Sequence, residues 1–508
     1  MKLLHLITPL IVVIFFTACK SKQNTEVVEI SEAMKIYRAT VPQINDLVHT
    51  KLELKPDFIN QEMPGVATIT LKPHFYAVDS LILDAKYMRI ESVQIIDTVG
   101  GKEVNKDLKY NYDSLKLRIA LDKRYTRDQS YTININYVSQ PERVPSDGSA
   151  AITDRKGLYF INHDNTDLDK PVQLWTQGET EAASCWFPTL DAPNQKSTEE
   201  IQVQVPSKYK TISNGVLYKS EMLNASVRID FWKQEKAHAP YLFALVVGDF
   251  AEVKDTWNGK QVNYYVEHSY EKYAHLVFGN TPEMIEFYSN VLMLPYPWDK
   301  YHQVVVRDFV SGAMENTGCV VHFDKLQHDN REHLDNPFED IIAHELFHHW
   351  FGDLVTCESW SNLPLNESFA TYGEYLWNEY KYGRDEADYK LKEFHEKYID
   401  EANEEPKTLV RYHYEAQEDM FDRHSYQKGG SVLHMLRKYV GDEAFFLSLN
   451  KYLKDNAYKT AEVSDLRKAF ESVTGEDLNW FFDQWFYSAS HPKLKVEHNY
   501  SDANGYMR

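Results

Sequence analysis

The first half of the chain alternates apolar and polar residues. The alternation has a period of two in residues 67–71 (ATITL), 131–137 (YTININY) and 201–205 (IQVQV). This period is typical of strands with one buried and one solvated face. Turn sequences separate such runs, among them Gly100-Gly101 and residues 145–148 (PSDG). We therefore predict an all-β domain over residues 45–250.

Beyond residue 250 the pattern becomes helical. Apolar residues recur with helical spacing in residues 338–351, 367–380, 386–405 and 464–473. Ser464 is the predicted N-cap of the last of these helices, and Gly475 is its predicted end. The sequence thus predicts a multidomain α+β protein, in which an N-terminal all-β domain precedes a mainly helical domain over residues 251–490.

Composition narrows the functional classes. The 508 residues exceed one ordinary domain, and 43% hydrophobic with 14% aromatic residues is enough for large cores. The formal net charge of −21 argues against nucleic-acid binding and favours solubility. Cys185, Cys319 and Cys357 have no paired spacing, so we predict buried or free thiols without a metal role.

The N-terminus has the pattern of a targeting segment. Lys2 precedes an apolar run over residues 3–16, which is too short to span a membrane, and Thr17-Ala18-Cys19 follows. The small residue before the cysteine resembles a bacterial lipoprotein processing site. We predict a signal peptide over residues 1–18, a lipidated Cys19 and a tether with the N-terminal segment over 19–44. The protein would be lipid-anchored on the extracytoplasmic side of a bacterial envelope; a secreted protein and an uncleaved anchor are the alternatives.

Residues 344–348 (HELFH) carry the strongest chemical signal. In a helix, His344 and His348 lie one turn apart on one face, so both imidazoles can reach one ion. Glu345 lies beside the first histidine, where it can address a metal-bound water. Glu367 follows after 18 intervening residues and supplies a third ligand. His349 points away from the shared face, and we do not expect it to bind the metal.

Four further segments accompany this motif. They are residues 176–179 (TQGE), 312–316 (GAMEN), 365–370 (LNESFA) and 425–429 (SYQKG). Residues 344–356 (HELFHHWFGDLVT) are similar to HELxHQWFGNLVT, and Ser368 stands where glycine is commoner. Over roughly residues 45–500 the chain resembles the zinc aminopeptidases related to aminopeptidase N and leukotriene hydrolase. The resemblance implies a thermolysin-like catalytic domain after the β domain.

The resemblance also implies a role for each matched residue. His344, His348 and Glu367 would hold one Zn²⁺ per chain, with Glu345 as general base and Tyr426 as the oxyanion donor. Glu315 and Glu179 would bind the free α-ammonium of a peptide, assisted by Gln177; Glu181 leaves the register of Glu179 ambiguous. The backbone of Gly312 and Ala313 would pair with the substrate as an added strand.

These expectations favour a zinc-dependent aminopeptidase that removes single N-terminal residues. The family normally continues beyond its catalytic domain, and we expect residues 491–508 to begin a β-sandwich, with a first strand at 491–496. The chain would be either truncated or a minimal form, so a catalytically impaired peptide-binding protein is the alternative. Ala313 disfavours an epoxide hydrolase. An internal peptide offers no cation to Glu315 and Glu179, which disfavours an endopeptidase.

Overall fold

The computed structural model describes most of the chain. The described residues are 31, 33–99, 102–146, 148–498, 500, 501, 506 and 507. The predicted signal peptide, Cys19 and the turn at Gly100-Gly101 lie outside them. In this described part, no helix combines the length and the apolar character that a bilayer crossing requires.

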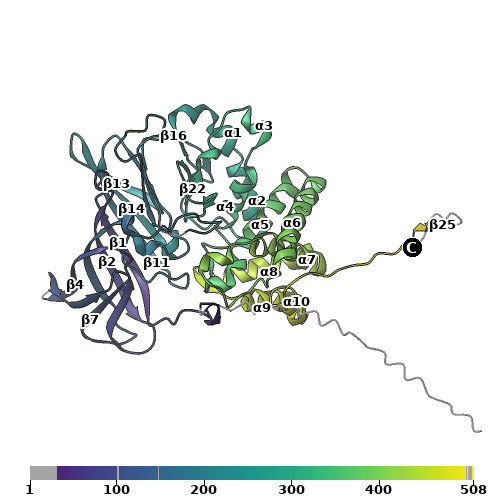
Figure 1. Cartoon of the computed structure of the whole chain (residues 1–508), viewed down its shortest axis with the longest axis horizontal. Coiled ribbons are helices and arrows are strands. Elements are labelled where there is room, and N and C mark those ends of the chain that lie inside the picture. The colour runs from purple at the N-terminus through teal and green to yellow at the C-terminus, as the bar shows by residue number, and fades with distance from the viewer. Residues whose placement is uncertain are drawn as a thin grey trace, which may run out of the picture.

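The N-terminal half is built on an eight-stranded sheet (Figure 1) with the order β13-β14-β11-β1-β2-β8-β4-β5. Its strands are β1 (Asn45–Leu54), β2 (Met63–Pro73), β4 (Arg89–Val99), β5 (Lys102–Asp107), β8 (Tyr131–Ser139), β11 (Ser197–Pro206), β13 (Val216–Asn224) and β14 (Val227–His238). The alternating segments of the sequence fall in β2, β8 and β11, where every second residue is buried. The predicted strands are confirmed.

Two smaller sheets complete the β-rich half. They have the orders β3-β7-β6 and β12-β15-β10-β9. Their strands are β3 (Val78–Asp84), β6 (Lys109–Tyr112), β7 (Lys116–Tyr125), β9 (Leu158–Ile161), β10 (Gln173–Thr176), β12 (Lys210–Ser213) and β15 (Leu245–Gly248). Side chains from all three sheets, such as Ile69, Leu83 and Leu174, share one core. Burial of this apolar surface holds the sheets together.

A five-stranded sheet with the order β16-β19-β20-β22-β21 follows, before most of the helices. Its strands are β16 (Ala251–Val253), β19 (Tyr264–Val266), β20 (His302–Val306), β21 (Ala313–Met314) and β22 (Cys319–Phe323), and the hairpin β17 (Thr256–Trp257) and β18 (Lys260–Gln261) lies beside it. The expected change to helices near residue 250 is therefore too early. Strands buried on both faces, such as β20, show no alternation, which is why the pattern missed them.

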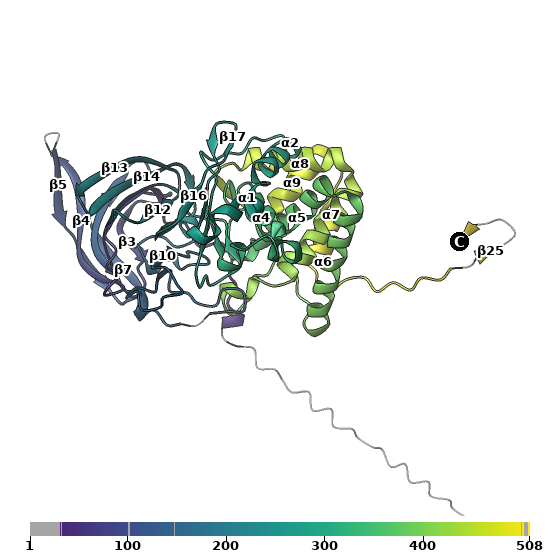
Figure 2. The same ribbon diagram turned by 90° about the horizontal axis from the view of Figure 1, so that it is seen from above.

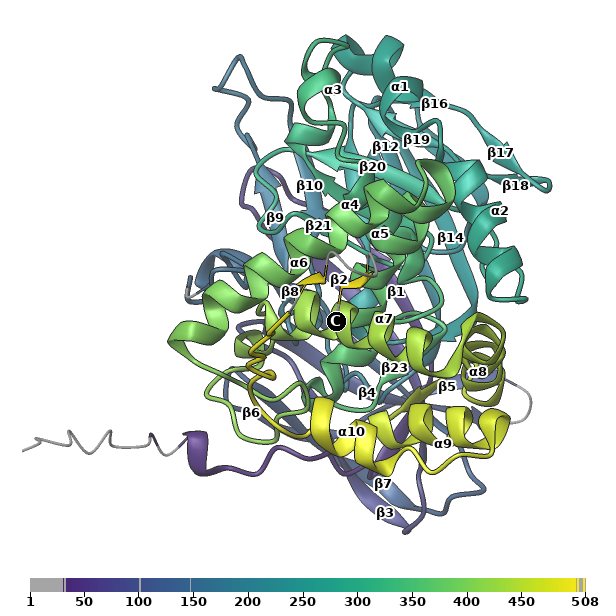
Figure 3. The ribbon, with the colours of Figure 1, turned by 90° about the vertical axis from the view of Figure 1, so that its right-hand side faces the viewer.

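The second half is mainly helical, as predicted (Figures 2 and 3). Its helices are α1 (Ala274–Phe278), α2 (Thr281–Val291), α3 (Glu332–Asp335), α4 (Glu339–Phe347), α5 (Glu367–Lys381), α6 (Arg384–Glu404), α7 (Gly429–Val440), α8 (Asp442–Asp455), α9 (Val463–Thr474) and α10 (Asn479–Trp485). Short strands β23 (Val355–Cys357) and β24 (Lys459–Ala461) pair in parallel. The last pair is β25 (Tyr500–Ser501) and β26 (Tyr506–Met507).

Three local predictions need correction. The helix expected over 338–351 ends at Phe347, because the chain turns there toward β23. Helix α9 is capped by Glu462, so Ser464 lies inside the helix, whereas Gly475 ends it in a left-handed conformation as predicted. The strand expected at 491–496 does not form: residues 491–498 pair with no strand in the described chain.

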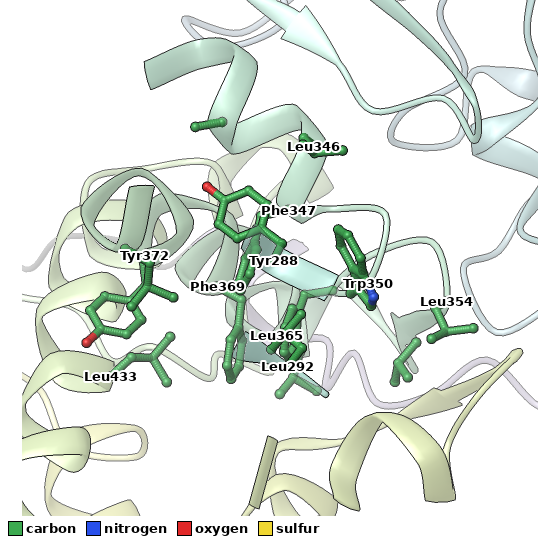
Figure 4. Close-up of a cluster of buried hydrophobic side chains, with 14 of the residues drawn as sticks. Tyr288, Leu292, Leu346, Phe347, Trp350, Leu354, Leu365, Phe369, Tyr372 and Leu433 are labelled. Carbon is green, nitrogen blue, oxygen red and sulfur yellow. The ribbon is translucent and has the colours of Figure 1, made fainter. Parts of the chain in front are cut away.

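A dense apolar core fixes the helices that carry the site. Figure 4 shows Tyr288, Phe347, Phe369 and other large side chains packed between α2, α4 and α5. The phenol of Tyr288 donates to the carbonyl of Gly373 on α5, at 2.8 Å. A Cβ at Gly373 would lie 2.7 Å from the Cβ of Phe347, so the close approach of α4 and α5 requires a glycine.

The chain before β1 ties the two halves together. The guanidinium of Arg38 donates to the carbonyls of Tyr414 and Glu415, at 2.9 and 3.0 Å. The hydroxyl of Ser361 donates to the carbonyl of Arg38, at 2.6 Å. The side-chain amide of Asn214, in the β-rich half, donates to the carbonyl of Thr317, at 3.0 Å. The bonds of Arg38 thus fasten the chain before β1 to the helical half, and the bond of Asn214 fastens the β-rich half to the loop that follows β21.

Candidate functional site

Two histidines and a glutamate converge between α4 and α5. Helix α4 presents His344, and His348 caps its end one turn later, while Glu367 is the first residue of α5. The Nε2 atoms of His344 and His348 lie 3.2 and 3.5 Å from Oε2 of Glu367. One ligand atom from each of the three residues lies within 4.8 Å of the others. This set of two imidazoles and a carboxylate fits a divalent metal with an open position.

Hydrogen bonds at Nδ1 orient both imidazoles. His344 Nδ1 lies 3.0 Å from Oε1 of Glu374, and His348 Nδ1 lies 3.0 Å from the carbonyl of Phe351. Because Nδ1–H donates to these acceptors, each ring in its neutral, metal-binding form has its lone pair at Nε2, which faces the third ligand. Lys390 bridges Glu374, at 3.1 Å, and Asp340. Glu374 is not among the residues predicted from the sequence, although its place two turns after Glu367 on α5 could have indicated it.

We expect Glu374→Ala to weaken metal binding about 10- to 100-fold, because the acceptor that fixes the His344 ring is lost. Glu374→Gln keeps an oxygen acceptor and should lose less. Competition with a chromophoric chelator measures both affinities. Glu443→Gln, an exposed substitution on α8, is the control. Equal affinities in all four proteins would contradict the orienting role.

Buried negative charge surrounds the histidines. Burial raises the pKa of Glu345 to about 8. For His348, the carboxylates of Glu315 and Glu367 outweigh burial and raise its pKa to about 10. Oxygens of Glu345, Glu315 and Glu179 are buried without a hydrogen-bond partner among the described residues. An excess of buried carboxylates calls for cations, and a divalent metal together with a substrate amine would satisfy it.

The two carboxylates expected to bind an amine lie beside the histidines. Glu315 follows β21, and its Oε1 is 3.9 Å from Nδ1 of His348. Glu179 follows β10. Burial raises the pKa of its carboxyl well above the usual range, and the charge of Glu315 raises that pKa further. By contrast, Glu181 contacts Gln417, at 3.1 Å, and lies near Lys86. The structure therefore brings Glu179, and not Glu181, to the histidines.

Gln177, Gly312 and Ala313 frame the same region. The amide of Gln177 donates to Sδ of Met314, at 3.2 Å, and its Oε1 has no partner in the described part of the chain. Ala313 begins β21, the edge strand of the five-stranded sheet. A Cβ at Gly312 would meet no atom within 4 Å. The edge thus has room for an extended peptide backbone.

Tyr426 lies in a π-helix, His424–Lys428. Its ring stacks on the ring of His344, with centroids 5.8 Å apart and planes at 8°. Burial, together with the charge of Glu367, holds the pKa of Tyr426 well above its usual range, so the phenol keeps its proton. The hydroxyl of Ser368 donates to the carbonyl of Ser425, at 2.6 Å. The sequence indicated neither the π-helix nor this bond.

His349 has a structural role and does not join the three candidate ligands. Its Nδ1 lies 3.1 Å from the carbonyl of Glu345, and its Nε2 accepts from the backbone N–H of Gly318, at 3.0 Å. It therefore links α4 to the turn after Glu315. The three thiols Cys185, Cys319 and Cys357 are buried and free, as predicted.

A cavity of about 890 Å³ opens onto this centre. Its inner end is formed by His344, Glu345 and Tyr426, and one side by residues 311–313. The segment 335–341 and the facing sides of α5 and α6 form its outer walls. A cavity of this size accommodates several residues of an extended peptide.

Comparison with known proteins agrees with this geometry. Residues 45–242 match the peptidase M1 N-terminal domain, and residues 276–485 match the peptidase family M1 domain. Aminopeptidase M1 of Arabidopsis thaliana is 31% identical over 356 residues, covering 67% of this chain and 40% of the relative. Tricorn protease-interacting factor F2 of Thermoplasma volcanium is 30% identical over 358 residues, covering 67% of this chain and 43% of the relative.

A third relative is similar over more of the chain. Glutamyl aminopeptidase of Bitis rhinoceros is 25% identical over 467 residues, covering 89% of this chain and 47% of the relative. The chain thus spans less than half the length of these relatives. The two matched domains, in this order, account for most of the β-rich half and of the helical half. The chain belongs to peptidase family M1.

Proposed function

We propose that this protein is a zinc-dependent aminopeptidase that removes single residues from the N-terminus of peptides. The observation that carries the proposal is the pair of buried carboxylates, Glu315 and Glu179, beside the HExxH centre. Each has an oxygen without a hydrogen-bond partner among the described residues. A free α-ammonium would satisfy both with charge-assisted hydrogen bonds. The names of the relatives, two of which are aminopeptidases by name, support the same activity.

The metal site fits zinc by its donor set. His344, His348 and Glu367 would hold Zn²⁺, a Lewis acid that activates water and polarises a carbonyl. Glu345 would take a proton from the attacking water on Oε2 and pass it to the leaving nitrogen. The phenol of Tyr426, beside the ring of His344, would donate to the developing oxyanion. One water is consumed, and an amino acid and a shortened peptide are released.

Substrate position follows from the same residues. With the α-ammonium on Glu315 and Glu179, only the first peptide bond reaches Glu345. The edge of β21 would pair with the substrate backbone. Gln177 has an unpaired Oε1 in the described chain and would accept a third ammonium hydrogen. Fixed distance between amine and base explains removal of one residue at a time.

The test uses aminoacyl-coumarins with free and acetylated N-termini. We expect cleavage of the free forms alone, abolished by a chelator and restored by Zn²⁺. Acetylation removes the cation that the two carboxylates bind, so the loss should exceed about 100-fold. Equal cleavage of free and acetylated substrates would contradict the role of Glu315 and Glu179. No cleavage by the folded, zinc-loaded protein would contradict the enzyme proposal.

We also propose, from the sequence motif alone, that Cys19 carries a lipid on the extracytoplasmic side of a bacterial envelope. Metabolic labelling with a fatty acid analogue tests it. We expect label on the wild-type protein in membranes, and none on Cys19→Ser. Label retained by the variant would overturn the assignment.

A further inference from the structure

Carboxylates dominate the outer walls of the cavity that opens onto Glu345. Its acidic lining residues beyond that centre are Asp335, Glu339, Asp340, Glu374, Glu386 and Glu393, against the cations Lys390 and Lys397. Glu345, a residue only 6% exposed, lines the same cavity, and its Oε2 has no hydrogen-bond partner in the described chain. The acidic walls therefore belong to a ligand site and are not merely solvated surface.

The cavity is placed to receive the leaving side of a substrate. Glu345 and Tyr426 line it, whereas neither Glu315 nor Glu179 does. The N-terminal residue of a peptide would therefore lie on the other side of the centre, at the amine-binding carboxylates. The residues after the scissile bond would run along the cavity toward α6.

The carboxylates of the walls differ in how much of their charge is neutralised. Asp340 and Glu374 share the ammonium of Lys390. Glu339 accepts from the phenol of Tyr382 and the amide of Asn280.

Two carboxylates of α6 are left without such partners. Glu386 and Glu393 lie two turns apart on one face of the helix. Neither forms a salt bridge with a described residue. Lys397, one turn further on, is the exposed cation of this face and leaves the wall acidic.

We propose that this wall selects peptides with a cationic side chain just after the scissile bond, with Glu386 and Glu393 as the specificity residues. An arginine or lysine there would meet two carboxylates that form no salt bridge with a described residue. A glutamate would meet repulsion. The inference rests on the proposed aminopeptidase function and names its substrate class.

Three peptides that differ only at the second residue test the proposal: Ala-Arg-Ala, Ala-Ala-Ala and Ala-Glu-Ala. We expect kcat/KM to fall in that order, with about 3- to 10-fold between successive peptides, a range set by partly exposed ion pairs. High salt should compress the differences, because exposed charges are screened. The Glu386→Gln/Glu393→Gln variant should lose most of the discrimination between Arg and Glu.

A matched control lies on the same helix. Glu396 is exposed, pairs with Lys392 and does not line the cavity, so Glu396→Gln should discriminate as the wild type does. Equal kcat/KM for the three peptides, or unchanged discrimination in the double variant, would overturn the proposal. If no peptide is cleaved, the aminopeptidase proposal fails separately. Equilibrium binding of the same peptides to zinc-loaded protein then decides the charge preference, and equal Kd values would overturn it.

Discussion

Glu345→Gln is expected to lower kcat about 10²- to 10⁴-fold, the range that a positioned general base contributes. The amide has nearly the shape of the carboxylate but cannot take a proton from water. Glu345 lies on α4 between the two histidines and lines the cavity, and its Oε2 has no partner among the described residues. Removal of its charge therefore breaks no hydrogen bond of that oxygen, and the fold should remain intact. Steady-state kinetics with an N-terminally free coumarin substrate measures the loss.

The metal content and thermal melting of Glu345→Gln distinguish a chemical defect from a structural one. We expect both to match the wild type, since the ligand set is His344, His348 and Glu367. Tyr426→Phe is the companion variant, with an expected loss of about 10²- to 10³-fold in kcat, the usual effect of one oxyanion donor. A Glu345→Gln protein with full zinc and activity within a few fold of wild type would contradict the base assignment.

The residues of the candidate site differ in how strongly the sequence alone indicates them. An HExxH segment fixes its own geometry, because four residues bring His344 and His348 to one helical face. The approach of Glu367 to the two histidines depends on tertiary packing, which hydrophobic periodicity does not encode. Glu367 was predicted as a ligand from the resemblance of its segment to the zinc aminopeptidases. Tyr426 is one of 34 tyrosines and has no local signal of its own. Only the neighbouring residues of its motif identified it.

The elements that were missed share a physical cause. Strand β20 is buried on both faces and therefore lacks the alternation that revealed β8 and β11. The orienting contact of Glu374 and the π-helix around Tyr426 arise where separate helices meet. Such features depend on which neighbour supplies a hydrogen bond, and a single sequence does not contain that information.

Gly429→Ala is expected to destabilise the protein by about 1–3 kcal/mol, because it overpacks the junction of α5 and α7. A Cβ at residue 429 would lie 1.7 Å from Oγ and 2.4 Å from Cβ of Ser368. Rotation of the hydroxyl alone cannot relieve the second contact. The Oγ also holds the carbonyl of Ser425, so its displacement disturbs the segment that carries Tyr426. Thermal or urea unfolding should report the lower stability, and kcat should fall with it.

The substitution Ser368→Gly serves as the control for the prediction on Gly429→Ala. Alone, it removes a buried hydrogen bond worth about 1 kcal/mol. Combined with Gly429→Ala, it removes both atoms that clash, so the double variant should be more stable than the sum of the single losses predicts. The difference is a coupling free energy of about 1–3 kcal/mol from a double-mutant cycle. Strict additivity would mean that Gly429 tolerates a side chain without help from residue 368. Coupling would show instead that Ser368, beside the third candidate ligand, and Gly429, at the end of the segment that carries Tyr426, depend on each other. One local contact would then set both the packing of α7 and the position of Tyr426.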